Sequence, residues 1–162
     1  MANEKLIRVG ITQGDTNGIG YEVILKTLAD GLLCELCTPV VYGSSKIATY
    51  HRKALDMPQV QFNCIDTADK ARDGVNNMVE IADSDMKIEL GVPSEAAGLA
   101  AFNSLERAVA DLKDGLIDVL VTAPINKNNI QSDNFHFPGH TEYLEAALGY
   151  GKKSLMILFN DF

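Results

Sequence analysis

The sequence has few of the features that mark disulfide-rich, nucleic-acid-binding, membrane-spanning or secreted proteins. It has three cysteines, Cys34, Cys37 and Cys64, and an odd number in an acidic chain argues against a disulfide framework. Lys and Arg number 14 against 22 Asp and Glu, and the net charge of −8 argues against a nucleic-acid or anionic-membrane surface. No apolar run approaches the roughly 20 residues that a membrane helix needs. The start, MANEKLIRVG, contains no apolar signal-peptide core, so we expect a cytoplasmic protein.

What is present suits one domain with a real core. The chain has 162 residues, of which 46% are hydrophobic and 22% charged, with no internal repeat or low-complexity linker. Its acidity does not exclude a phosphorylated metabolite as ligand, because backbone amides and one lysine outweigh net charge at short range.

Cys34 and Cys37 have the C-x-x-C spacing of a redox pair or of half a zinc site. No second C-x-x-C and no nearby histidine pair completes a tetrahedral site. The spacing therefore favours two small buried side chains in a connection between a helix and a strand.

Short apolar runs alternate with segments of helical period along the whole chain. The expected strands are 6–11, 40–42, 60–65, 117–121 and 154–159, and the expected helices are 19–29, 45–55, 95–114 and 141–148. Ser44 and Ser94 are the expected helix caps, and Gly115 and Gly149 the expected helix ends. This alternation predicts an α/β fold with a mostly parallel sheet covered by helices on both faces.

Three of these segments carry more specific expectations. Residues 74–90 are expected to form a strand and a turn, with a hairpin as one alternative. The unbroken apolar run 117–121 is typical of a strand that is buried on both faces of a parallel sheet. The run 154–159 is an apolar strand with nothing after it to cover it, so we expect an N-terminal portion of a longer protein.

The first motif, Gly14-Asp15-Thr16-Asn17-Gly18-Ile19-Gly20, lies between an expected strand and an expected helix. Its spacing is neither the dinucleotide G-x-G-x-x-G nor a P-loop. Two interpretations stay open: a tight strand-to-helix turn, or an anion or cofactor loop in which Gly14, Asp15, Gly18 and Gly20 adjoin the free amides of the helix.

The second motif, Val121-Thr122-Ala123-Pro124-Ile125-Asn126-Lys127, follows a buried strand. Ligands in open α/β sheets lie beyond the carboxyl ends of the strands. Asn126 and Lys127 are therefore candidates for meeting an anionic substrate, and a solvated loop lysine is the alternative.

The third motif, NFHFPGHTEYL, holds His136 and His140 four positions apart, as in a zinc-binding helix. Pro138 and Gly139 lie between them and break such a helix. We expect instead a turn that brings His140 and Thr141 to the first turn of a helix, where imidazole, hydroxyl and backbone amides can meet a substrate oxygen. His136 and His51 are expected to be structural or surface residues.

Together these motifs resemble those of the 4-hydroxythreonine-4-phosphate dehydrogenase family of pyridoxal phosphate biosynthesis. The family pattern GDPAGIGPE, V-T-A/G-P-I/V-x-K and F-x-G-H-T-E corresponds here to GDTNGIGYE, VTAPINK and FPGHTEY. Thr16, Asn17 and Tyr21 depart from it. The first motif is also similar to the GDGIGPE turn of isopropylmalate and isocitrate dehydrogenases, which implies the same three-layer α/β/α fold.

The resemblance implies that His140 and Thr141 contact the substrate. It also implies a homodimer that uses NAD or NADP and a divalent cation (zinc, magnesium or cobalt). The family's three histidine ligands lie beyond the matched segments, so we expect no metal ligand and no catalytic residue within 1–162. Residues 1–162 are then the N-terminal α/β portion of a two-domain dehydrogenase, inactive alone and prone to self-associate.

The implied reaction is oxidation and decarboxylation of 4-phosphohydroxy-L-threonine to an aminoketone phosphate. One alternative is a related dehydrogenase of threonate or erythronate 4-phosphate. Another, of a different class, is a non-catalytic domain that binds a ligand or only self-associates.

Overall fold

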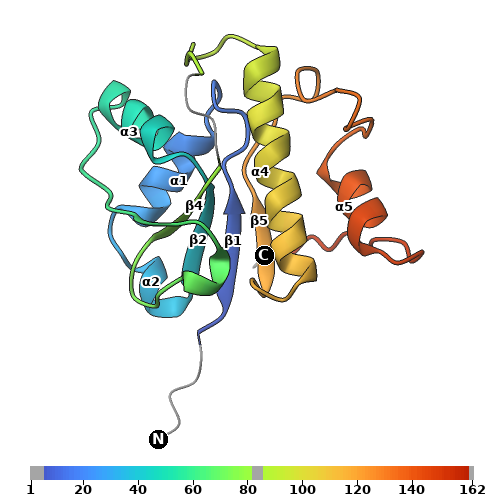
Figure 1. Ribbon diagram of the computed structural model, residues 1–162, viewed down its shortest axis with the longest axis horizontal. Helices are drawn as coiled ribbons and strands as arrows, with labels where there is room; N and C mark the ends of the chain where they lie inside the picture. The colour runs from blue at the N-terminus through green and yellow to red at the C-terminus, as the bar shows by residue number, and fades with distance from the viewer. Residues whose placement is uncertain (1–5, 82–85, 161–162) are drawn as a thin grey trace, which may run out of the picture.

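A computed structural model describes residues 6–81 and 86–160 of the chain. Its centre is a five-stranded sheet in the order β3-β4-β2-β1-β5, in which every pairing is parallel (Figure 1). The strands are β1 (Arg8–Thr12), β2 (Thr38–Gly43), β3 (Asn63–Ile65), β4 (Asn77–Glu80) and β5 (Val119–Thr122). The predicted α/β class is confirmed, and the sheet is more regular than the mostly parallel one expected.

Helices cover the sheet on both sides and complete the three layers. They are α1 (Gly20–Leu28), α2 (Leu33–Leu36), α3 (Ser45–Ala54), α4 (Glu95–Lys113) and α5 (His140–Leu148), with a 3₁₀ turn at Ala68–Lys70. Side chains of a parallel strand alternate between the two faces. In β2, Val41 packs with α1 and α3, whereas Val40 and Tyr42 pack on the α4 side.

The helix boundaries follow the local signals in the sequence. The Ser44 hydroxyl accepts a hydrogen bond from the Ile47 amide at 3.4 Å, and the Ser94 hydroxyl accepts one from the Ala97 amide at 3.2 Å. Both predicted caps are therefore confirmed. Gly115, with φ of +70°, follows the last residues of α4 in the left-handed conformation that glycine adopts at little cost.

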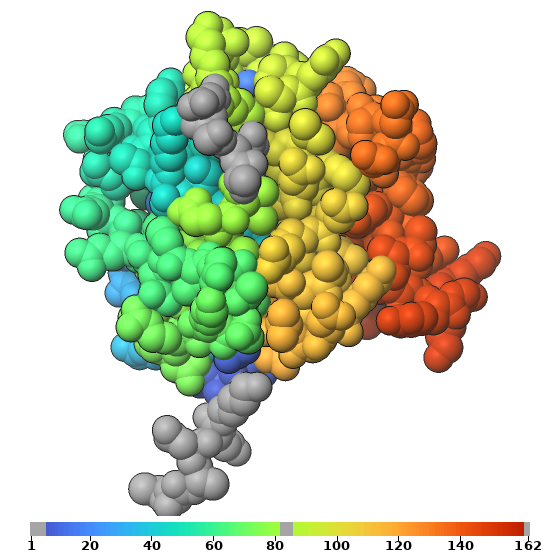
Figure 2. All heavy atoms as spheres, in the orientation of Figure 1, coloured from blue at the N-terminus to red at the C-terminus, as the bar shows by residue number. Residues whose placement is uncertain are grey.

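A hydrophobic cluster outside the sheet joins α4 to the segment that follows β5. Phe102 and Leu105 of α4 pack against Ile130 and Phe135. The outer helix α5 has no fully buried residue, and it contacts this cluster through partly buried side chains, among them Tyr143. Figure 2 shows the residues after about 125 as a region beside α4 that projects from the body of the molecule.

The prediction that 117–121 is a strand buried on both faces is wrong. The strand is Val119–Thr122, and it lies at the edge of the sheet, where β1 is its one partner among the described strands. Val119 and Val121 are 42% and 50% exposed. Helix α4 buries one side of this apolar run. On the opposite side of the sheet, α1 extends over β1 and β2 but leaves β5 uncovered.

The prediction of a strand at 154–159 is also wrong for this structure. The segment has no strand assignment, and Leu155 to Phe159 are 71–90% exposed. A strand requires a neighbouring strand for its backbone hydrogen bonds, and none of the described strands pairs with this segment.

The stretch 74–90 contains the single strand β4, which pairs in parallel with β2 and β3, so β4 belongs to no hairpin with either. Residues 82–85 of this stretch lie outside the described residues. The expected strand 60–65 is shorter than predicted, because only Asn63–Ile65 pairs with β4, while Val60 and Phe62 pack on the core beside α3.

Among residues 6–81 and 86–160, no helix has both the length and the apolar composition to cross a membrane.

Candidate substrate site

The candidate residues gather beyond the carboxyl ends of β1 and β5. These parallel neighbours end at Thr12 and Thr122, which are register partners. The loops that follow them, 13–19 and 123–130, lie side by side with the first turn of α4, at the upper end of the sheet in Figure 1. This is the edge at which α/β proteins with parallel sheets bind ligands.

A buried polar network holds the start of the first loop. The Tyr21 hydroxyl donates to Gln13 Oε1 at 2.6 Å and accepts from the Ser44 amide at 2.8 Å. The Gln13 side-chain amide donates to the Ala100 carbonyl at 3.0 Å. Tyr21, which departs from the family pattern, therefore joins the end of β1 to the cap of α3 through its hydroxyl group, and Gln13 extends the network to α4.

Asn17, a second departure, attaches the loop to the segment before α4. Its side-chain amide donates to the Val92 carbonyl at 2.8 Å and to the Ser94 hydroxyl at 3.2 Å. Its side-chain oxygen accepts from the Glu89 amide at 3.0 Å. Because Asn17 is buried, these bonds fix the loop against the start of α4.

Asp15 is buried in the same loop and bonded on three sides. Its amide donates to the Pro124 carbonyl at 2.9 Å. One carboxylate oxygen accepts from the Asn17 amide at 2.9 Å, and the other accepts from the Asn129 side chain at 3.4 Å. Asp15 therefore contacts the loop that carries the second motif.

The glycines of the first motif permit this close packing. Gly14 has a φ of +68°, and a Cβ there would collide with the Pro124 carbonyl. A Cβ at Gly20 would collide with the Gln13 carbonyl. The Gly18 amide donates to the Asp15 carbonyl at 3.0 Å. Packing between the loops accounts for these residues, and their binding of an anion or a cofactor stays a prediction.

Asn126 and Lys127 form the turn of the second loop. The Asn126 side-chain oxygen accepts hydrogen bonds from the amides of Asn128 and Asn129, at 2.9 and 3.4 Å, so it shapes the turn. Lys127 is exposed and extends toward the start of α5. A Cβ built on Gly139 would lie 3.7 Å from Lys127 Cε and 4.0 Å from its Nζ.

His140 is the first residue of α5, and Gly139 before it provides no side-chain cap. Its Nε2 atom is buried and has no hydrogen-bond partner among residues 6–81 and 86–160. Burial, and then the nearby Lys127 ammonium, lower the pKa of His140 below its ordinary value. The imidazole is therefore neutral at pH 7, and its unpartnered nitrogen can bond to a ligand oxygen.

Thr141 is exposed beside His140 in the first turn of α5, where the helix amides have no intrahelical acceptor. The structure therefore brings Lys127, His140 and Thr141 to one helix start, and their contact with a substrate stays a prediction. Two contacts that organise this arrangement, those of Asp15 with Pro124 and Asn129, connect residues more than 100 positions apart. No local pattern could have indicated them.

The other two histidines lie elsewhere. His136 is exposed. His51 is buried in α3, stacks on Tyr21 with ring centroids 5.2 Å apart, and bonds to the Thr16 carbonyl at 2.7 Å. Burial lowers the pKa of His51. The expectation of structural or surface roles agrees with both positions.

Cys34 and Cys37 are buried free thiols in α2 and at its end, and Cys64 is an exposed free thiol. Burial raises the pKa of Cys34 and of Cys37, which keeps both protonated at pH 7. The interpretation as small buried side chains is confirmed. In the described part of the chain, no group of three or more His, Cys, Asp or Glu could hold a metal ion.

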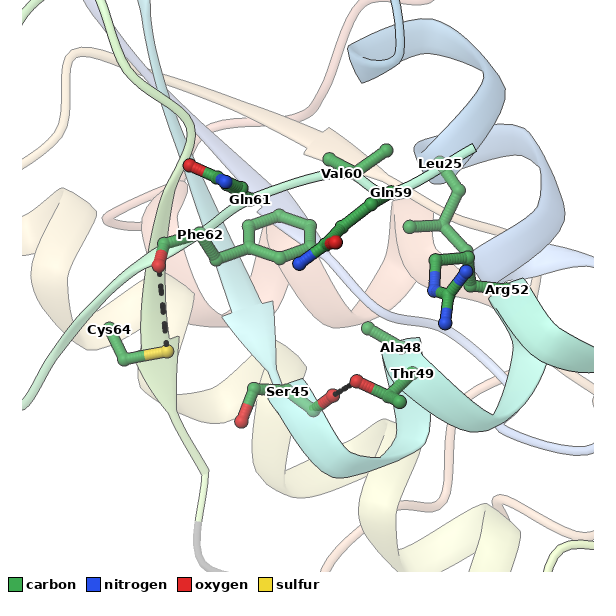
Figure 3. A pocket seen from close by; sticks show the side chains of 10 residues that line it. All are labelled: Leu25, Ser45, Ala48, Thr49, Arg52, Gln59, Val60, Gln61, Phe62 and Cys64. Atoms are coloured by element: carbon green, nitrogen blue, oxygen red, sulfur yellow. Dashed lines mark hydrogen bonds between the residues drawn. The ribbon is translucent and has the colours of Figure 1, made fainter. Parts of the chain in front are cut away.

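A separate pocket of about 380 Å³ lies between α3 and the segment before β3 (Figure 3). Arg52 and Thr49 of α3 line one side of it, and Gln59 and Phe62 line the other. It contains none of the predicted site residues, so it is distinct from the site at the start of α5.

Comparison with known proteins places the motifs in one family. The family model described as "Pyridoxal phosphate biosynthetic protein PdxA" matches residues 35–161. The 4-hydroxythreonine-4-phosphate dehydrogenase of Bacteroides thetaiotaomicron is 57% identical over 160 residues, which are 98% of this chain and 44% of that protein. The D-threonate 4-phosphate dehydrogenase of Cupriavidus necator is 35% identical over 152 residues, which are 93% of this chain and 45% of that protein.

The fold agrees with a solved structure of the same family. A 4-hydroxythreonine-4-phosphate dehydrogenase from Burkholderia phymatum superposes with a TM-score of 0.81 at 32% identity, over 90% of this chain and 44% of that one. The chain thus spans less than half the length of these relatives. The resemblance inferred from the three motifs is confirmed, and the chain belongs to the PdxA family of pyridoxal phosphate biosynthetic proteins.

Proposed function

We propose that residues 1–162 are the N-terminal α/β portion of a two-domain, NAD(P)-dependent dehydrogenase that acts on 4-phosphohydroxy-L-threonine. The secondary alcohol loses a hydride to the cofactor and a proton, and the resulting β-keto acid loses carbon dioxide to give an aminoketone phosphate. The support is the 57% identity to a 4-hydroxythreonine-4-phosphate dehydrogenase across almost the whole chain.

The observation that carries the proposal is the meeting of Lys127 and His140 at the start of α5. The Lys127 ammonium is exposed and attracts an anionic group of the substrate. His140 presents an unpartnered Nε2 to a substrate oxygen, and the Thr141 hydroxyl and the helix amides add donors. Asn126 shapes the turn that presents Lys127, so we propose that it acts on the substrate only indirectly.

The described residues do not provide a complete set of groups to bind the cofactor or the metal ion of the expected reaction. A bound nicotinamide supplies the hydride acceptor. The amides of Asp15, Asn17 and Gly18 all donate within the protein, so this part of the first motif does not fit a pyrophosphate. The described residues offer no cluster of metal ligands either, and we propose that the divalent ion is bound by other residues of the intact protein.

A second candidate is a dehydrogenase of threonate or erythronate 4-phosphate. It is favoured by the 35% identity to a D-threonate 4-phosphate dehydrogenase, a lower value than for the first candidate. The two substrates share the phosphate and differ in the amino group, so contacts with the phosphate alone cannot distinguish them. A non-catalytic ligand-binding or self-associating domain is the candidate of another class.

The test is an assay of the full-length protein with 4-phosphohydroxy-L-threonine and D-threonate 4-phosphate, each with NAD and with NADP. We expect the higher kcat/KM for the amino acid substrate, and no turnover by the 162-residue chain alone. A higher kcat/KM for the threonate ester would transfer the proposal to the second candidate. Binding of either acid without turnover by the full-length protein would support the binding-domain alternative.

We propose a cytoplasmic homodimer as the form of the intact protein. In the 162-residue chain, the uncovered side of β5 and the exposed apolar residues 155–159 are surfaces that can recruit a second chain. Size-exclusion chromatography with light scattering tests this directly. A monomer of 17.6 kDa over a wide concentration range would contradict self-association of the chain.

A further inference from the structure

Asp15 is bonded to both ends of the turn that presents Lys127, to one end through its backbone amide and to the other through its buried carboxylate. The Asp15 amide donates to the Pro124 carbonyl at 2.9 Å, and its carboxylate accepts from the Asn129 side chain at 3.4 Å. Lys127 lies between these two anchors in the sequence. The path of the turn is confined further by Gly98 of α4, where a Cβ would collide with the Asn129 backbone.

This turn determines where the Lys127 ammonium lies relative to His140. Lys127 Nζ lies 4.0 Å from the position of a Cβ on Gly139, the residue before His140. Glu142, in the first turn of α5, approaches the same position with one carboxylate oxygen at 3.7 Å. A shift of the turn therefore changes the charge beside the imidazole. From α4, the Glu106 carboxylate contributes, after burial, to raising the pKa of Tyr143 in α5.

We propose that Asp15 is a positioning residue: by holding Pro124 and Asn129 it fixes the turn of Lys127 and thereby the approach of Lys127 to His140. Its importance for catalysis rests on the proposed function, but the geometric link does not. Asp15 itself does not contact the substrate in this account. Its amide and both of its carboxylate oxygens are occupied by protein groups.

Two simpler roles for Asp15 make different predictions. If Asp15 only stabilised the fold, its removal would leave the pKa of His140 unchanged in protein that remains folded. If Asp15 acted on His140 directly by its charge, removal of the carboxylate would lower the pKa of His140, because an anion favours the imidazolium. If Lys127 instead moves away from the imidazole, the pKa of His140 rises, because a nearby cation disfavours the imidazolium.

The test is an NMR titration of the three histidines in the 162-residue chain, with resonances assigned through His136→Gln and His140→Gln. Lys127→Gln should raise the pKa of His140, since it removes the ammonium that disfavours the imidazolium. Asp15→Ala should raise it by a similar amount. The double variant Asp15→Ala/Lys127→Gln should show no further rise, because both changes remove the same interaction.

Three further variants make the result specific. Asp15→Asn should restore most of the wild-type pKa, since the new carboxamide can accept from the Asn17 amide and donate to the unpartnered Asn129 Oδ1. Glu35→Gln removes one negative charge from the exposed surface of α2 and should change nothing. Asn129→Ala breaks the same link from a less buried residue and replaces Asp15→Ala if that variant does not fold.

An unchanged or lowered pKa of His140 in folded Asp15→Ala or Asn129→Ala would overturn the proposal. In the full-length enzyme, Asp15→Ala should lower kcat/KM about as much as Lys127→Gln, and Asp15→Asn should recover it. A raised pKa of His140 in the chain together with a full-length protein that does not oxidise the substrate would refute the proposed function and leave the positioning role standing.

Discussion

All six residues of β2 are buried, whereas Val119 and Val121 of β5 are 42% and 50% exposed, although both strands pair with β1. The difference lies in what covers them. Helices α1 and α3 pack on one side of β2 and α4 on the other, whereas within the described part of the chain β5 is covered only on the α4 side. The half of the sheet around β2, the closed half, buries its apolar side chains. The half at β5, the open half, leaves apolar side chains exposed.

The candidate site lies at the junction of these two halves. Asp15 and Asn17 belong to the closed half and are buried and hydrogen-bonded. Lys127 and His140 belong to the open half, on a loop and a helix that has no fully buried residue. The closed half therefore supports a candidate site whose proposed ligand-binding groups lie in a more exposed region.

The largest expected effect comes from the same substitution made in each half. Leu25 of α1 is 1% exposed and Leu155 is 83% exposed. Leu25→Ala should lower the free energy of unfolding by about 2–5 kcal/mol, because it leaves a cavity in a packed core. Leu155→Ala should change it by less than about 0.5 kcal/mol. Urea denaturation of both variants measures the contrast, and equal losses would mean that residues after α5 share the core.

A smaller loss is expected from Asn17, which joins the closed half to the start of α4. Asn17→Ala removes three hydrogen bonds of a buried side chain and should cost about 1–3 kcal/mol of unfolding free energy. The matched control is Asn134→Ala, at an exposed position in the open half. Thermal and urea unfolding measure the stability of both variants. An equal loss of unfolding free energy in Asn17→Ala and Asn134→Ala would contradict this account.

The closed half should also respond to acid through His51. Burial lowers the pKa of His51 below its ordinary value of 6.5, so the folded chain binds fewer protons than the unfolded chain. The stability that neutral His51 contributes is present above pH 6.5 and is lost as the pH falls below it. Unfolding free energies at about pH 7.5 and 5.5 should show this loss in the wild type and in His136→Gln. A His51→Gln variant with an undiminished loss would assign the pH dependence to other groups.

The smallest effect on stability is expected at the open edge. Val121→Lys should change the unfolding free energy by less than about 0.5 kcal/mol, since the side chain is half exposed. It should nevertheless reduce self-association, because charged residues on an edge strand oppose pairing with another chain. Light scattering of Val121→Lys beside Val75→Lys, a control in the loop before β4, checks this. Equal association of both variants would place the contact elsewhere.

The sequence predicted what local chemistry controls. The caps Ser44 and Ser94 and the helix end at Gly115 follow from short-range patterns and are present. The order of strands and helices up to β5 was also predicted, except for the short helix α2, where a connection was expected. The motif spacing also predicted that His140 begins a helix and does not pair with His136. These features depend on neighbouring residues, which a single sequence displays directly.

What the sequence did not predict depends on contacts between distant segments. Residues 117–121 and 154–159 are both apolar runs, but whether such a run is covered depends on which elements pack beside it. Similarly, Asn17 was seen only as a departure from a family pattern. Its bonds to residues 89–94 became visible when the fold brought the two segments together.

The most direct test of the account compares the two histidines of the third motif in the full-length enzyme. His140→Ala should lower kcat/KM for 4-phosphohydroxy-L-threonine by roughly tenfold to a thousandfold, because a contact between the imidazole and the substrate is lost. His136→Ala, at an exposed position four residues earlier, should leave kcat/KM near the wild-type value. Near-normal kinetics of His140→Ala, or equal losses in both variants, would contradict a substrate site at the start of α5.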